Sequence, residues 1–242
     1  MTIRIGTAGW AIARDVSDRF PAEGSSLERY GSRFGVAEIN SSFHRAHRAS
    51  TWQRWRDSVP PAFRFSVKLP KTITHQAKLR DCDDLLDDFA EQVRNLGDKL
   101  AVILVQLPPK LELDMLSASQ LFEGLAQRCS AMLACEPRNT TWFTAEADDF
   151  LRELRVARVA ADPALLPSAA RPGGWTSLQY WRLHGSPRMY RSTYRDRIDQ
   201  LASAITSEAK GRSETWCIFD NTASSAATGD ALALCSAISA DV

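Results

Sequence analysis

The sequence predicts an α/β fold, a single TIM-type (β/α)8 barrel domain that spans residues 1–242. Three observations predict it. Eight short apolar runs begin about 20 to 40 residues apart, which is the spacing of βα units. Most of these runs are separated by segments with helical spacing of apolar residues. Eight such repeats in 242 residues match the size of one barrel with a parallel sheet.

Each expected strand is a short apolar run that ends in polar residues. The eight runs are residues 3–7, 36–40, 63–69, 100–107, 132–136, 156–162, 178–185 and 215–221. A doubly wound sheet is the structural alternative. No run is followed by a glycine-rich GxGxxG motif or a phosphate-binding loop, so the sequence favours the barrel.

Five segments predict helices, because apolar side chains recur on one face. They are residues 85–100, 115–129, 195–211 and 229–239, and the first part of 150–159, which then turns into the sixth strand. The segment 162–177 differs, since it contains three Pro and two Gly residues. We therefore expect an irregular loop in place of most of the helix between strands six and seven. The expected apolar stripes include Leu85, Phe89, Val93 and Leu96 in the first segment and Leu116, Leu121, Phe122 and Leu125 in the second.

The composition excludes several classes of protein. The net charge is +1, from 30 basic and 29 acidic residues, so nucleic-acid or membrane binding over the whole surface is disfavoured. No apolar run is long enough to span a membrane, and the first residues lack the pattern of a signal peptide. The five cysteines are odd in number and form no CxxC pair, which favours reduced thiols. We expect a cytoplasmic protein.

Polar residues gather at the ends of the expected strands. In a barrel of this type, the carboxyl ends of the strands and the loops after them carry the chemistry. Burying so many charges costs several kcal/mol per ion unless partners are present. The side chains either form ion pairs that cap the core or line a pocket, and as a set they favour a pocket. They are Glu38, Asn40, Lys68, Gln106, Glu136, Arg138, Asp162, Arg182, His184, Asp220 and Asn221.

Several motifs resemble one known family. They are GTAGW (6–10), EINSSFHR (38–45), FRFSVKLPKTITH (63–75), LGDKLAVILVQLPP (96–109), CEPRNTTWF (135–143), YWRLHG (180–185) and IFDNTASSAA (218–227). In order and over nearly the whole chain, they are similar to the YecE-like proteins, the domain-of-unknown-function family 72. The resemblance implies a TIM-type barrel and no established reaction. Trp142 and the strand-end residues above, apart from Asp162 and Asp220, fit the family pattern.

The chain departs from that family pattern at four positions. Pro137 stands where an aromatic residue is usual, and Asn139 stands where a His is frequent. His44 replaces a usual Tyr, and Asp220 replaces the first Asn of a usual Asn-Asn pair. The charged residues of the pattern are kept, whereas the shape of the inner wall differs.

Four residues are candidates for catalysis. Glu38 and Glu136 are expected to act as an acid/base pair, because two carboxylates in a dry site push their pKa values apart. The alternative is that arginines neutralise both. Lys68 could form a Schiff base if burial lowers its pKa, and the alternative is an ion pair with Glu38 or Glu136. His184 either transfers protons or holds a loop carbonyl.

The remaining strand-end residues are candidates for substrate binding. Arginine forks and a histidine suit a carboxylate or phosphate group. The predicted substrate-binding residues are Asn40, Gln106, Arg138, Trp142, Arg182, Asp220 and Asn221. No cofactor and no metal ligand are predicted. A divalent metal held by Glu38, Glu136, Asp162, His184 and Asp220 is the less favoured alternative.

Together these residues favour an enzyme that uses acid/base chemistry at the barrel mouth. Its substrate is expected to be a small polar or anionic metabolite, of a phosphorylated or sugar-like kind. A barrel that acts on nucleic acid is one alternative, supported by the basic run HRAHR at 44–48. A non-catalytic module that binds a metabolite or a partner is the other. The sequence leaves the oligomeric state open.

Overall fold

The computed structural model describes residues 2–211 and 213–240. Its strands are β1 (Thr2–Ala8), β2 (Val36–Ile39), β3 (Arg64–Lys68), β4 (Leu100–Gln106), β5 (Met132–Glu136), β6 (Val156–Arg158), β7 (Ala160–Asp162), β8 (Gly173–Gly174), β9 (Leu178–Leu183) and β10 (Glu214–Phe219). Its α-helices are α1 (Ser26–Gly31), α2 (Ala49–Asp57), α3 (Asp83–Val93), α4 (Met115–Arg128), α5 (Ala145–Glu153), α6 (Ile198–Ala209) and α7 (Ala227–Ala240).

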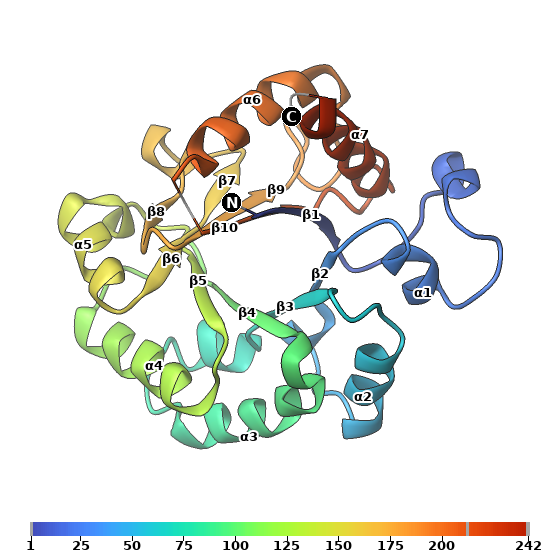
Figure 1. Ribbon diagram of the computed structural model, residues 1–242. Helices are drawn as coiled ribbons and strands as arrows, with labels where there is room; N and C mark the ends of the chain where they lie inside the picture. Colours follow the sequence, from blue (N-terminus) through green and yellow to red (C-terminus); the bar gives the residue numbers. More distant parts are fainter. Residues whose placement is uncertain (1, 212, 241–242) are drawn as a thin grey trace.

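The strands form one sheet that curves into a near-closed barrel with the helices outside it (Figure 1). The order is β7-β9-β10-β1-β2-β3-β4-β5-β6-β8, and every pair except β6 with β8 is parallel. All eight expected strands are present. The predicted α/β barrel is therefore confirmed, and all its parallel strands end on the same side.

The sixth expected strand is divided into two halves that close the barrel. β6 pairs with β5, whereas β7 pairs with β9 on the other side. The change of partner occurs at Val159, whose N–H donates to the Cys135 carbonyl at 2.8 Å. A two-residue strand at Gly173–Gly174 then runs antiparallel to β6. The predicted irregular loop is present, because only a short 3-10 turn, Pro167–Ala170, and β8 lie between β7 and β9.

The helices begin and end where local chemistry favours it. α1 has a capping box, in which Ser25 and Glu28 each accept from the other's backbone N–H. Asp114 and Thr144 cap α4 and α5 in the same manner with their side chains. One position of the predicted stripes is wrong. Leu116 is 68% exposed, because a step of two residues from Ala118 turns it away from the buried stripe of Ala118, Leu121 and Leu125.

Two apolar clusters lie on the two faces of the sheet. The larger one lies between the strands and the helices. The smaller one fills the inside of the barrel, and it contains residues from almost every strand. Side chains alternate between the two faces along each strand, so membership of the inner cluster identifies the inward-facing positions. The inner cluster comprises Val36, Val102, Leu104, Ala134, Ala157, Val159, Leu178, Tyr180, Trp216 and Ile218.

Within the described residues, none of the helices combines the length and the apolar character that crossing a membrane requires.

Candidate active site at the barrel mouth

The alternation of each strand brings polar residues to the inward face at its carboxyl end. A residue two positions after an inner-cluster residue points the same way if the strand continues. The apolar inside of the barrel is therefore followed by a polar layer. Two positions after Val36, Leu104, Ala134, Tyr180 and Ile218 come, in that order, Glu38, Gln106, Glu136, Arg182 and Asp220.

Arg182 lies at the centre of this polar layer. Its guanidinium holds Glu38 in a bidentate pair, with Nε at 3.0 Å from Oε2 and Nη2 at 2.7 Å from Oε1. Nη1 donates to Glu136 Oε2 at 2.5 Å, and Nη2 also donates to Asp220 Oδ2 at 2.9 Å. Arg182 is fully buried. One arginine therefore joins three carboxylates from three strand ends.

Tyr180 binds Glu38 through its hydroxyl, and Ser66 binds Tyr180. The Tyr180 hydroxyl contacts Glu38 Oε2 and the Ser66 hydroxyl, each at 2.9 Å. Burial, and then the nearby Glu38 charge, raise the pKa of Tyr180 well above its usual value, so it donates as a neutral phenol. Sequence reasoning did not select either residue. The available signal was spacing, since Tyr180 precedes Arg182, and Ser66 precedes Lys68, by two positions.

His184 bridges two of the carboxylates held by Arg182. Nδ1 lies 3.0 Å from Asp220 Oδ2, and Nε2 lies 3.1 Å from Glu136 Oε1. Burial alone would lower the pKa of His184, but the Glu136 charge and hydrogen bonds to Asp220 and Glu136 raise it. An imidazole flanked by two carboxylates donates to both only when it is protonated. This setting therefore favours the protonated form of His184 at the floor of the mouth.

The expected acid/base division between Glu38 and Glu136 is not supported. Burial would raise the pKa of Glu136, but the charges of Arg182 and His184 hold it well below its usual value. Glu136 also accepts from Arg138 at 3.0 and 3.1 Å. Arg182 lies between the two glutamates, so each meets a cation rather than the other's negative charge, as in the alternative that arginines neutralise both. These cations favour the ionised form of Glu136, and the acid/base role of the two glutamates stays a prediction.

Lys68 is a cation that the cluster leaves without an acidic partner. It is 8% exposed, and no carboxylate oxygen of the described residues lies within the 4.0 Å of an ion pair. The ion pair with Glu38 or Glu136 considered above is thus absent. Its Nζ instead lies 4.2 Å from the centre of the Phe43 ring. Burial, and then the positive charge of Arg182, lower the pKa of Lys68.

Arg138 and Tyr190 form the outer edge of the mouth. The side chain of Arg138 is 26% exposed, and only Nε and Nη2 contact Glu136. Tyr190, in the loop after β9, lies edge-on above His184 with ring centres 5.7 Å apart. Its hydroxyl is 3.5 Å from Arg138 Nη2. Asn40 completes the edge on the other side, with Nδ2 at 3.3 Å from Asp220 Oδ1.

Four strand-end or loop residues do not join this cluster through a direct contact. Trp142 is fully buried, and its indole N–H donates to the Leu111 carbonyl, so neither ring face is open to a ligand. Asn221 donates to Asp230 and to the Ser192 carbonyl. Asp162 points outward and pairs with Arg197. Gln106 faces inward, but its amide donates to the Leu107 carbonyl.

The carboxylates are not arranged as a metal site. Across residues 2–211 and 213–240, no three His, Cys, Asp or Glu side chains gather as ligands for a metal ion. Asp162 lies on the outer face, and Arg182 occupies the position between Glu38, Glu136 and Asp220. A divalent ion at these carboxylates would have to displace the guanidinium.

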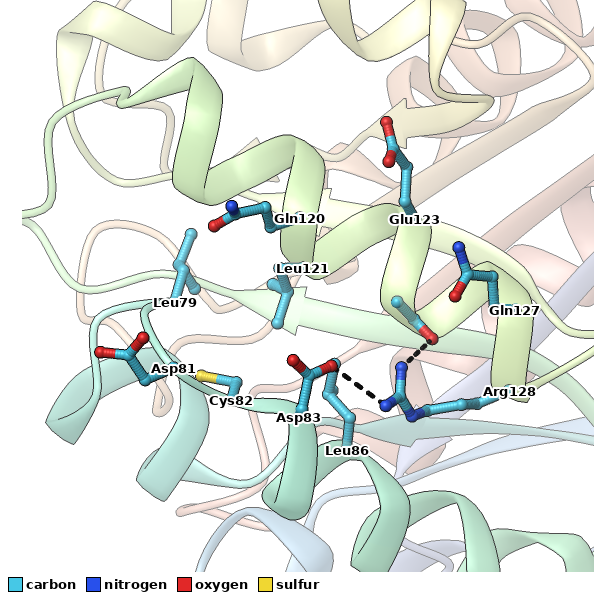
Figure 2. Close-up of a pocket in the computed structure, with 11 residues that line it drawn as sticks. Leu79, Asp81, Cys82, Asp83, Leu86, Gln120, Leu121, Glu123, Gln127 and Arg128 are labelled. Carbon is cyan, nitrogen blue, oxygen red and sulfur yellow. Dashed lines mark hydrogen bonds and ion pairs between the residues drawn. The ribbon is translucent and has the colours of Figure 1, made fainter.

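A separate pocket of about 320 Å³ lies outside the barrel, between α3 and α4 (Figure 2). Its walls carry Cys82 and Leu86 on one side and Gln120 on the other. Arg128 crosses its edge, where it contacts Asp83 at 3.0 Å and the Gly124 carbonyl at 3.2 Å. None of the polar residues of the barrel mouth lines this pocket.

The chain matches a known family of proteins. The model of the family "Protein of unknown function DUF72" matches residues 4–242 of this chain. The chain belongs to the DUF72 family. The UPF0759 protein YecE of Escherichia coli K12 is 37% identical over 84 residues, which are 35% of this chain and 31% of YecE. The matched region thus spans about a third of that relative's length.

Solved structures support the fold. A DUF72 family protein from Enterococcus faecalis superimposes with a TM-score of 0.82 and 19% identity, over 98% of this chain and 96% of the other. D-psicose 3-epimerase from Clostridium cellulolyticum, solved with D-tagatose, gives a TM-score of 0.56 and 10% identity, over 99% and 96%. Both likenesses concern the barrel. Neither assigns a reaction to this DUF72 protein.

Proposed function

We propose that this DUF72 protein is an enzyme that binds a small polar metabolite by a carboxylate or phosphate group and performs acid/base chemistry on it. The observation that carries the proposal is Lys68, a mostly buried cation at the mouth that has no carboxylate partner among the described residues. Burial of a charge without a partner is costly, so its retention favours a role in which a ligand supplies the partner.

The charges of the mouth support an anionic ligand. Glu38, Glu136 and Asp220 carry three negative charges, and Arg138, Arg182 and protonated Lys68 carry three positive ones. Protonated His184 then leaves a surplus of one positive charge. Arg182 has its donors committed to carboxylates, whereas Arg138 has Nη1 available and Lys68 has its ammonium protons available. An anion between Arg138 and Lys68 would be held by both.

Lys68 is also the group best suited to move a proton. A proton-transfer group works best when its pKa lies near the working pH, and the surroundings of Lys68 move its pKa down toward that range. The charges of Arg182 and of the three carboxylates act on the ammonium group of Lys68. A lysine with a lowered pKa could also form a Schiff base with a carbonyl substrate.

The first experiment is a thermal-shift panel of inorganic phosphate, phosphorylated sugars and small organic acids. A ligand at a hundredfold its Kd stabilises the folded protein by about 2.7 kcal/mol. We expect a hit that is lost in Lys68→Met and weakened in Arg138→Ala. Lys210→Met is the matched control, because Lys210 is exposed just before β10, at the opposite end of the barrel.

The outcomes distinguish the proposal from the other functions. No hit with any anion would contradict it and favour the partner-binding module. A hit that survives in Lys68→Met would place the ligand elsewhere. Binding of single-stranded or duplex DNA that weakens steeply with salt would favour the nucleic-acid alternative. Turnover of the ligand separates an enzyme from a binding protein. It should be lost in Lys68→Met, whereas Lys68→Arg should change binding less.

A further inference from the structure

A second pocket of about 230 Å³ opens beside the mouth. Its walls come from the loop after β2, the loop after β3 and the side of α3. Both loops follow the carboxyl ends of strands, so the pocket lies on the same end of the barrel as the polar cluster. Its lining includes Phe43, Arg45, Trp52, Lys71, Leu85 and Phe89.

Phe43 is the wall that the pocket shares with the mouth. It lines the pocket, and the Lys68 ammonium lies 4.2 Å from the centre of its ring. The neighbouring Ser42 fixes this wall to β3, because its hydroxyl contacts the Lys68 carbonyl at 2.7 Å and the Ile39 carbonyl at 2.9 Å. One aromatic side chain therefore contacts Lys68 and also lines the pocket.

The pocket has an apolar floor under a basic rim. Trp52 and Phe89 are buried and Leu85 is half-buried, which gives the pocket an apolar floor. Arg45 and Lys71 at the rim make no ion pair with any residue in the described part of the chain. The rim also contains one acidic side chain, Asp88, so its charges sum to +1.

Two imidazoles pack against the Phe43 ring, and that of His44 lies edge-on to it with ring centres 4.9 Å apart. His75 lies edge-on to the Phe43 ring, with centres 5.1 Å apart. Burial, and then the positive charges of Lys68 and Arg138, lower the pKa of His75, so it is neutral at pH 7. An apolar ring beside Phe43 would thus meet aromatic surface rather than a second imidazolium.

We propose that this pocket is a second subsite for the same ligand, and that the ligand carries a flat apolar ring next to its anionic group. The inference rests on the proposed function, because it assumes that the anion lies between Lys68 and Arg138. The ring would contact Phe43 and the floor at Trp52 and Phe89. The substrate class is an aryl-bearing or other ring-bearing phosphate or carboxylate.

Matched ligands test this subsite on the full chain by calorimetry. The pairs are inorganic phosphate with phenyl phosphate, and acetate with phenylacetate, so that the two arms distinguish a phosphate from a carboxylate group. Burial of a phenyl ring predicts binding at least about tenfold tighter for the aryl member of the preferred pair. Ala46→Trp is expected to fill the pocket and to remove that gain while the small anion still binds.

Ala164→Trp is the control, because Ala164 is exposed in the irregular loop between β7 and β9, away from this pocket. Thr72→Trp, on the opposite wall, replaces Ala46→Trp if that variant fails to fold. Equal affinity for both members of each pair would overturn the subsite and leave the proposed function standing. A gain that survives both filling variants would also overturn it. No binding of any of the four anions would overturn both proposals.

Discussion

Two arginines of this protein do similar chemistry in different surroundings. Arg182, inside the barrel, joins three carboxylates at 2.5 to 2.9 Å between its terminal nitrogens and their oxygens. Arg128, outside it, joins Asp83 at 3.0 Å (Figure 2) and Asp87 at 2.6 Å. The side chain of Arg182 is 0% exposed, whereas that of Arg128 is 20% exposed and that of Asp83 is 85% exposed.

The comparison shows that exposure, not the number of bonds, sets the energetic role of an ion pair. Around Arg128, water and salt screen the charges, and such pairs contribute little to stability. Arg182 is fully shielded from bulk solvent, so the loss of a partner would leave each remaining charge buried alone. The inner cluster is therefore expected to be costly to break and strongly dependent on pH.

The largest effect is expected from Arg182→Met. The change leaves Glu38, Glu136 and Asp220 without their common partner, and removal of one partner from a buried pair costs about 3 to 5 kcal/mol. Urea denaturation measures the free energy of unfolding. A loss below about 1 kcal/mol would show that the cluster is more hydrated than the geometry indicates. If Arg182→Met does not fold, Arg182→Lys tests the loss of the bidentate contact to Glu38.

A pH dependence that the outer pair lacks is expected from His184. Its pKa is raised in the fold, so its stabilising contribution is complete below its ordinary 6.5 and is lost as the pH rises through the raised value. The pKa of Glu136 is lowered, so its contribution is present above its ordinary 4.5 and is lost as the pH falls through the lowered value. The two effects together predict the greatest stability from this cluster between pH 4.5 and 6.5.

The measurement is urea denaturation of the wild type and of His184→Gln from pH 5 to pH 9. The difference in unfolding free energy between the two proteins should be largest near pH 6 and should decrease at higher pH. A constant difference would mean that His184 is neutral in the fold.

A smaller effect of opposite sign is expected from Lys68→Met. The surroundings of Lys68 disfavour its charge, so an apolar side chain of similar length should stabilise the protein, on the order of 1 kcal/mol. The gain should shrink at alkaline pH, because neutral Lys68 carries no such penalty. Thermal denaturation at pH 7 and pH 10 checks both statements. A destabilised Lys68→Met would assign Lys68 a structural role and weaken the proposed function.

The smallest effect is expected from Arg128→Met. Exposed pairs contribute at most about 1 kcal/mol, and salt screens them further. The difference in unfolding free energy from the wild type should be at most about 1 kcal/mol in low salt and close to zero in 1 M salt. A loss as large as that of Arg182→Met would remove the contrast between the two arginines.

Alternation along strands accounts for much of what the sequence predicted about the site. Arg182 and His184 were expected on one face of the seventh strand, and they lie there together. The same rule identifies the error at Asp162. Ala157 and Val159 face the inside of the barrel. Every second residue of a strand faces the same way, so Ala161 faces inside and Asp162 faces outside. Asn221 follows the inward Asp220 by one position and contacts Asp230 instead.

Other features had no local signal. Trp142 lies in a 3-10 turn after β5, where neither strand nor helix spacing fixes its direction, and it packs under the Leu111 carbonyl. Tyr190 belongs to the irregular chain between β9 and α6, and Phe43 to a short turn after β2. Their positions over His184 and Lys68 depend on how whole loops fold back across the barrel end.

The sequence by itself determined the barrel, the order of its strands and the set of polar residues at their ends, because these follow from periodicity within each segment. Only the tertiary structure decided how the charges are shared. Arg182 is separated along the chain by 144 residues from Glu38, by 46 from Glu136 and by 38 from Asp220. Which carboxylates it takes, and that Lys68 receives none, depends on distances across the closed sheet that no local pattern encodes.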